Sequence, residues 1–78
     1  MILEIITPEK ELFSGEVTSV KFPGKNGGFE ILNNHAPIIS TLSKGEIRVV
    51  TTDQNIQQFE INGGVIEMQN NKIIVLAD

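Results

Sequence analysis

The sequence predicts an all-β protein, a flattened antiparallel β-sandwich or barrel of about ten short strands. Nothing in its 78 residues keeps a helical period over a useful length. Short runs of β-branched residues recur instead, with turn-forming residues between them about every 8–12 residues. Almost no long loop separates these runs, and neither an internal repeat nor a linker interrupts them. Residues 1–78 therefore form one domain.

Five strands are expected in the first half of the chain, at residues 2–7, 12–13, 16–22, 29–32 and 38–42. Pro8 ends the first strand, because proline cannot donate to a strand ladder. Ser14-Gly15 ends the second and Pro23-Gly24 the third, since these residues favour turns.

Four further strands are expected at residues 46–52, 56–61, 65–69 and 72–77. In the first of these, Ile47 and Val49 share one face and Arg48 lies on the other, as the period of two along a strand requires. Asn70 and Asn71 form the tip of the last hairpin, because asparagine tolerates the positive φ that a two-residue turn needs.

Composition excludes several classes of function. The net charge is −4, with ten acidic and six basic residues, which disfavours a nucleic-acid binder and a polybasic membrane-surface module. The apolar runs are far shorter than the roughly 20 residues needed to span a bilayer, and no signal peptide is evident. Without cysteine, the chain has neither a disulfide nor a thiolate metal site. Any work at a membrane therefore depends on other chains.

His35 is the only histidine and the first candidate for chemistry. A catalytic histidine needs a nucleophile or an orienting carboxylate close by, and Glu30 is the nearest acidic residue in sequence. Ser40 and Ser43 lie in no nucleophile-elbow pattern. One histidine with scattered carboxylates is a poor metal set. The favoured interpretation is a histidine that hydrogen-bonds its own loop or packs in an interface, with no metal or cofactor.

The glycines are interpreted as structural. Residues 24–27 satisfy the GxxG form of a nucleic-acid clamp, but the helices that such a module needs are absent. The favoured alternative is a tight turn in which Asn26-Gly27 supplies positive φ. Gly63-Gly64 indicates a bulge or a close backbone approach.

Five stretches, in order, carry a resemblance: residues 6–9 with 12–17, residues 22–24 with Gly27, residues 31–37 around Asn-His-Ala-Pro, residues 45–49, and residues 63–78 ending in Val-Leu-Ala-Asp. Along its entire length the chain resembles the N-terminal β-domain of the epsilon subunit of F-type ATP synthases. The resemblance implies a non-catalytic rotor part at the foot of the central stalk. It would clamp the gamma subunit to the c ring and help couple proton-driven rotation to ATP synthesis. It would be a peripheral subunit at the cytoplasmic face of the bacterial inner membrane.

The resemblance also implies two interfaces. The gamma-facing residues would be Thr7, His35, Pro37 and Ile38. The residues facing the c ring would be Lys25, Asn26, Gly27, Gly28, Phe29 and Glu30. Some relatives carry an acidic residue where this chain has Gly28. Glu30 is the acidic candidate nearby, although a shift of two residues preserves only the strand face.

Many relatives continue past the Leu-Ala-Asp end into a helical hairpin that inhibits ATP hydrolysis and in some members binds ATP. The sequence ends at Asp78, so the expectation is that this hairpin, its inhibition and ATP binding are absent. Two alternatives stay open from the residues alone. One is a free-standing β-sandwich that binds some other protein, and the other is a small enzyme or metal protein centred on His35.

Overall fold

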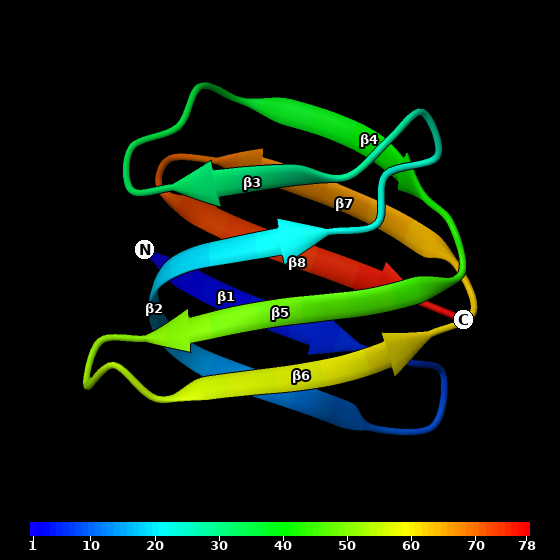
Figure 1. Ribbon diagram of the computed structural model, residues 1–78, viewed down its shortest axis with the longest axis horizontal. Coiled ribbons are helices and arrows are strands. Elements are labelled where there is room, and N and C mark those ends of the chain that lie inside the picture. Colours follow the sequence, from blue (N-terminus) through cyan, green and yellow to red (C-terminus); the bar gives the residue numbers. More distant parts are fainter.

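The computed structural model describes all 78 residues and contains strands and turns without a helix. Its eight strands are β1 (Ile2–Ile6), β2 (Glu11–Phe22), β3 (Phe29–Leu32), β4 (Ile38–Leu42), β5 (Gly45–Thr51), β6 (Ile56–Ile61), β7 (Gly64–Gln69) and β8 (Lys72–Ala77) (Figure 1). Because there is no helix, none is present that could cross a bilayer. The expected all-β sandwich is confirmed.

The strands form two layers that share β2. The first half of β2 pairs with β1, and its second half pairs with β3 and β5. Sheet A has the order β4-β7-β8-β1-β2, and sheet B has the order β3-β2-β5-β6. Figure 1 shows sheet B lying over sheet A in a curled, half-closed sandwich that measures 27 × 24 × 18 Å.

Eight strands are present where nine ranges were expected, because β2 is continuous. Two separate strands were expected on either side of Ser14-Gly15, and that prediction is wrong. Ser14 pairs with Glu4 and Gly15 pairs with Leu3, so the ladder with β1 runs straight through the dipeptide. Glycine permits a turn but does not impose one, and an available partner strand keeps it extended.

One strand pair departs from the expected antiparallel pattern. β1 and β8 pair in parallel, in a register that runs from Ile2 opposite Lys72 to Ile6 opposite Leu76. The other strand pairs are antiparallel. The two parallel strands lie at opposite ends of the chain, so no hairpin turn constrains their relative direction.

A core of sixteen apolar residues fills the space between the sheets. Its fully buried large side chains are Leu3, Ile5, Val17, Val20, Ile31, Ile47, Val49, Ile66, Met68, Ile73 and Val75. The expected alternation in β5 is confirmed, because Ile47 and Val49 are buried and Arg48 is not. At one edge Phe13 of β2 meets Phe59 of β6 with ring centroids 5.8 Å apart, which packs the two layers together where no ladder joins them.

The expected turn conformations are also present. Asn70 and Asn71 have φ of 53° and 59°, as a tight two-residue hairpin requires. Gly27 has φ of 121° in the turn before β3. Gly64 has φ of 155°, and a Cβ there would lie about 2.5 Å from the Leu76 carbonyl oxygen. The close backbone approach expected at Gly63-Gly64 is therefore confirmed.

Candidate functional site

The outward side of sheet A exposes an apolar surface. Across β4, β7, β8 and β1, one row of neighbouring positions runs through Val65, Leu76 and Ile6. The next row contains Ile39 and Ile74. Ile39 is 74% exposed, Leu76 57% and Val65 45%. Side chains directly opposite on neighbouring strands lie about 5 Å apart, so these residues form one surface.

Three shallow depressions join into a trough across this surface. The central depression is lined by Ile39, Val65, Glu67, Ile74 and Leu76. The depression at one end shares Ile39 and Glu67 with it and adds Pro37. The depression at the other end shares Leu76 and adds Thr7 and Pro8. We call this continuous surface the sheet A trough.

The strands that build the trough are apolar on both faces. Residues 73–77 of β8 read Ile-Ile-Val-Leu-Ala, and β1 reads Ile-Leu-Glu-Ile-Ile. Such near-continuous apolar runs are typical of strands that are covered on both sides. Within this chain only the inner side is covered. The outer side of sheet A is therefore suited to a partner.

Three of the four predicted gamma-facing residues line the two ends of the trough. Thr7 follows β1 and lines the end with Leu76, whereas Pro37 and Ile38 line the opposite end. Ile38 itself packs partly against the core. The outward side chain is that of Ile39, which the sequence analysis did not single out.

His35 lies in an exposed loop that two asparagines hold in place. The Met1 amino group donates to Asn33 Oδ1 at 2.7 Å, and the Asn34 amide donates to Asn71 Oδ1 at 2.8 Å. His35 Nδ1 lies 2.7 Å from the Ala36 carbonyl oxygen. A carbonyl only accepts, so Nδ1 carries the proton. The expectation that His35 hydrogen-bonds its own loop is confirmed. No group of three metal-ligating side chains gathers around it.

The predicted ring-facing residues divide into three groups. Residues 25–28 form an exposed turn that the Lys25 amide ties to β4 by a 3.1 Å hydrogen bond to the Thr41 carbonyl. Phe29 is half-buried and packs its ring 5.5 Å from that of Phe22. Glu30 of β3 lies opposite Lys21 of β2 and is exposed. The turn, Phe29 and Glu30 are thus neighbours in sequence, but they do not form one common surface.

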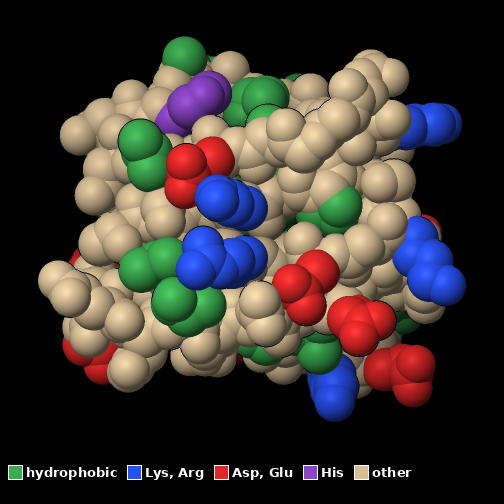
Figure 2. Space-filling view, in the orientation of Figure 1, with side chains coloured by type: hydrophobic (Ala, Val, Ile, Leu, Met, Phe, Trp, Pro, Cys, Tyr) green, Lys and Arg blue, Asp and Glu red, His purple; other side chains and the backbone are tan.

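The outward side of sheet B is more mixed in character. One row carries Leu32, Val50 and Ile56, and the next carries Glu30, Lys21 and Arg48 side by side across three strands. Figure 2, in the orientation of Figure 1, shows basic side chains in the middle of this face with acidic and apolar groups around them. Charged side chains therefore interrupt its apolar surface at the centre.

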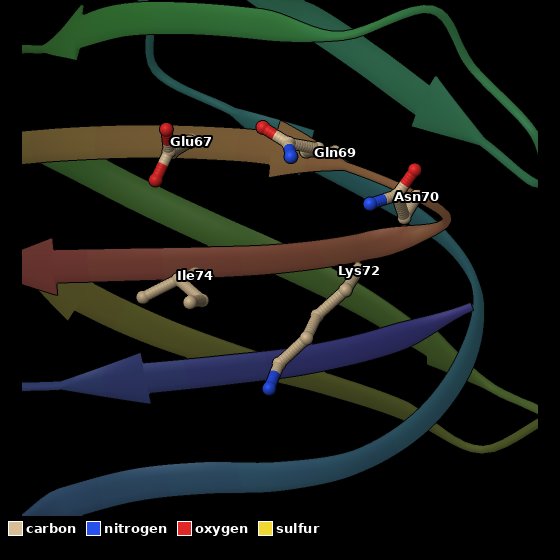
Figure 3. Close-up of a pocket in the computed structure, with 5 residues that line it drawn as sticks. All are labelled: Glu67, Gln69, Asn70, Lys72 and Ile74. Carbon is tan, nitrogen blue, oxygen red and sulfur yellow. The ribbon is translucent and has the colours of Figure 1, made fainter.

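The trough itself also carries acidic groups. Figure 3 shows Glu67 on β7 beside Ile74 on the adjacent β8, with the Lys72 side chain extending over β1. On the far side of Ile74 lies Glu4 of β1. The sequence analysis missed this surface, although the two-sided apolar runs of β1 and β8 were a readable signal for it.

The chain is similar to known proteins in both sequence and fold. Residues 1–78 match the family described as "ATP synthase, Delta/Epsilon chain, beta-sandwich domain". The "ATP synthase epsilon chain" of Chlorobium limicola is 45% identical over 76 residues, covering 97% of this chain and 86% of that protein. The protein of the same name from Dichelobacter nodosus is 40% identical over 74 residues, covering 95% of this chain and 52% of that protein.

A solved structure of the Euglena gracilis mitochondrial ATP synthase, "OSCP/F1/c-ring in rotational state 1", contains a chain with the same fold at a TM-score of 0.92 and 18% identity. The alignment covers 99% of this chain and 49% of that one, so this chain spans about half the length of its structural neighbour. The family match over the whole chain and the identity to curated relatives agree. The chain belongs to the ATP synthase delta/epsilon family and spans its β-sandwich domain.

Proposed function

We propose that this chain is a non-catalytic rotor component of an ATP synthase central stalk, which clamps the gamma subunit to the c ring. Its sheet A trough receives gamma, and its turn at residues 25–28 faces the ring. In this role it helps couple proton-driven rotation to ATP synthesis. The observation that carries the proposal is the trough, an apolar surface on strands whose sequences are typical of burial on both sides.

The energetics favour a protein partner over bare solvent at this surface. Covering a Val, Leu or Ile side chain is worth about 1.5–3 kcal/mol relative to leaving it exposed. Ile39, Val65 and Leu76 are all substantially exposed. Together with the partly buried Ile74, they supply several kcal/mol against the cost of association. Adjacent exposed apolar side chains of this kind are characteristic of an interaction site.

The ring-facing role rests on the turn at residues 25–28. Its four residues are exposed, and hydrogen bonds from Lys25 to Thr41 and from Ser43 to Pro23 hold it against the adjoining strands. A short turn that is fixed by hydrogen bonds in this way can contact another protein without changing its conformation. The matching family, together with the ring and stalk named in its structural neighbours, supports this assignment.

The proposed location is peripheral, at the cytoplasmic face of the bacterial inner membrane, with the complex providing the attachment. The proposed role needs no reaction within the chain. Its only histidine already uses Nδ1 in a bond to its own loop, and its serines lie in ordinary strand and turn positions.

Two matched substitutions test the gamma assignment. Ile39 of β4 and Ile56 of β6 are both exposed isoleucines on edge strands, and they lie on opposite sheets. Ile39→Asp is expected to lower the affinity for gamma about tenfold or more, because it removes an apolar contact and puts in its place a carboxylate that loses its hydration inside the interface. Ile56→Asp is expected to keep the affinity within about twofold. Unchanged gamma binding by the Ile39→Asp protein would refute the proposed docking face.

A further inference from the structure

Two carboxylates flank an apolar side chain at the centre of the trough. In the cross-strand register Glu67 of β7 lies opposite Ile74 of β8, and Ile74 lies opposite Glu4 of β1. All three side chains are on the outward side of sheet A, where Glu67 is exposed and Glu4 and Ile74 are partly buried. Neighbouring strands are about 4.8 Å apart, so the two acidic positions are about 10 Å apart.

These carboxylates lack partners within the chain. The side-chain hydrogen bonds involve residues of the loops and other strands, and neither Glu4 nor Glu67 takes part in one. Lys72 lies in the next row, opposite Ile2 and Gln69, and lines one depression together with Glu67 and Ile74. Figure 3 shows its side chain extended away from Glu67 and over β1, the strand that carries Glu4. Two carboxylates thus face a single lysine here, so the middle of the trough keeps a net negative charge beside its apolar side chains.

A partner that covers the trough removes water from both carboxylates. A carboxylate that loses its hydration without gaining a cation or hydrogen-bond donors is strongly unfavourable. A purely apolar partner surface would therefore bind poorly here, even though Ile39, Val65 and Leu76 favour one. The surface that fits must combine apolar contacts with at least one positive charge above Ile74.

We propose that the gamma subunit presents a basic side chain, preferably arginine, that lies over Ile74 and is shared by Glu4 and Glu67. This inference rests on the proposed function, in which gamma occupies the trough. Arginine suits the position because its planar, weakly hydrated guanidinium packs on an apolar surface. Its five N–H groups can also donate toward carboxylates on two sides. Lysine has a single compact charge and serves two separated acceptors less well.

Neutral isosteres test the electrostatic part alone. Glu4→Gln and Glu67→Gln keep the size of each side chain and remove its charge. Each is expected to weaken binding of gamma by about tenfold or more, because the cation of gamma is then buried beside one carboxylate instead of two. The combined Glu4→Gln and Glu67→Gln protein is expected to lose most of the salt dependence of binding that the unaltered chain shows.

The matched control uses the other sheet. Glu46 of β5 and Glu60 of β6 are exposed carboxylates directly opposite each other on the outward side of sheet B. The Glu46→Gln and Glu60→Gln protein has the same net charge as the trough double variant, so long-range effects cancel in the comparison. It is expected to bind gamma within about twofold of the unaltered chain.

The outcomes separate this inference from the docking proposal. Loss of binding in Ile39→Asp and in both trough glutamine variants supports both. If Ile39→Asp loses binding of gamma while both glutamine variants bind as well as or better than the unaltered chain, the shared basic residue is refuted and the docking face is supported. Full binding by Ile39→Asp overturns the docking face, and the inference with it.

Discussion

At Gly64 the space beside a single residue determines how closely two strands can approach. Its φ of 155° is one that L side chains rarely adopt, and a Cβ would meet backbone atoms of Leu76 and Ala77. Gly28 is the useful contrast, since a Cβ there would only touch the Phe22 carbonyl oxygen at an ordinary 3.5 Å. The two glycines look alike in the sequence, but only Gly64 depends on having no side chain.

Gly64→Ala is therefore expected to lower the free energy of unfolding by about 2 kcal/mol or more, from backbone strain and overpacking combined. Gly28→Ala is expected to change it by less than about 0.5 kcal/mol. Urea unfolding of both proteins measures the difference. Equal stability of the two variants would show that β7 and β8 can separate without cost at this point.

His35→Ala separates an interface role from a catalytic one. The side chain is exposed and hydrogen-bonds only the adjacent carbonyl, so stability is expected to change by less than about 1 kcal/mol. Affinity for gamma is expected to fall about fivefold, which corresponds to one lost hydrogen bond of about 1 kcal/mol. Calorimetric titration with gamma measures this. Complete loss of ATP synthesis in fully assembled complexes would instead support chemistry at His35.

At the scale of the elements, the hairpin of β7 and β8 also fixes a loop outside sheet A. Its tip residue Asn71 accepts the Asn34 amide, across 37 positions of sequence, and so holds the loop that precedes β4. Asn70 occupies the same turn with a similar φ and makes no such bond. The turn thereby positions the loop of His35 at one end of the trough.

Asn71→Gly keeps the turn but deletes that bond, since glycine accepts positive φ readily. Hydrogen exchange at the amides of Asn34 and His35 is expected to accelerate about fivefold, as the loss of about 1 kcal/mol implies. Asn70→Gly, the matched control, is expected to leave both amides unchanged. If both variants accelerate exchange equally, the turn and not the Asn71 side chain holds the loop.

The turn at residues 25–28 supports a prediction of its own. Lys25→Glu reverses the one charge of an exposed turn and leaves the backbone bond to Thr41 intact. Capture of a gamma–c-ring complex is expected to weaken several-fold by repulsion or a lost ion pair, while capture of gamma alone stays the same. Equal weakening in both experiments would assign this turn to gamma instead of the ring.

The sequence predicts local features of the elements well and their pairing less well. The period of two in β5 and the Asn-Asn and Asn-Gly turns are local signals, and all three are present in the structure. The continuity of β2 through Gly15 and the parallel pairing of β1 with β8 depend on partners far away in the chain. Alternation along a strand carries no information about the direction of its neighbour.

For the candidate site the limit is of the same kind. The resemblance singled out Thr7 and Ile38, which lie at the ends of the trough, but not Ile39, Val65 or Leu76. These three face outward because of a register that spans β4, β7 and β8. Only the two-sided apolar runs of β1 and β8 hinted at them. The position of Glu4 beside Ile74 likewise needed the parallel register of β1 and β8.

At the scale of the whole molecule, two unequal faces cover one closed core. The sheets share β2 and bury sixteen apolar residues between them, and such a close-packed interior deforms little. One outward face is a continuous apolar trough with acidic groups, and the other is interrupted by Lys21 and Arg48. A stiff body with one apolar docking face fits the rotor role proposed above.

The methyl groups of the two faces offer the most direct measurement of this asymmetry. In a methyl-labelled chain titrated with gamma, the NMR signals of Ile39, Val65, Ile74 and Leu76 are expected to shift. Their relaxation by a paramagnetic agent dissolved in the solvent is expected to decrease, because gamma covers them. The signals of Leu32, Val50 and Ile56 on sheet B are expected to stay unchanged. Shifts confined to the sheet B methyls, with the trough methyls still exposed to solvent, would contradict the docking of gamma in the trough.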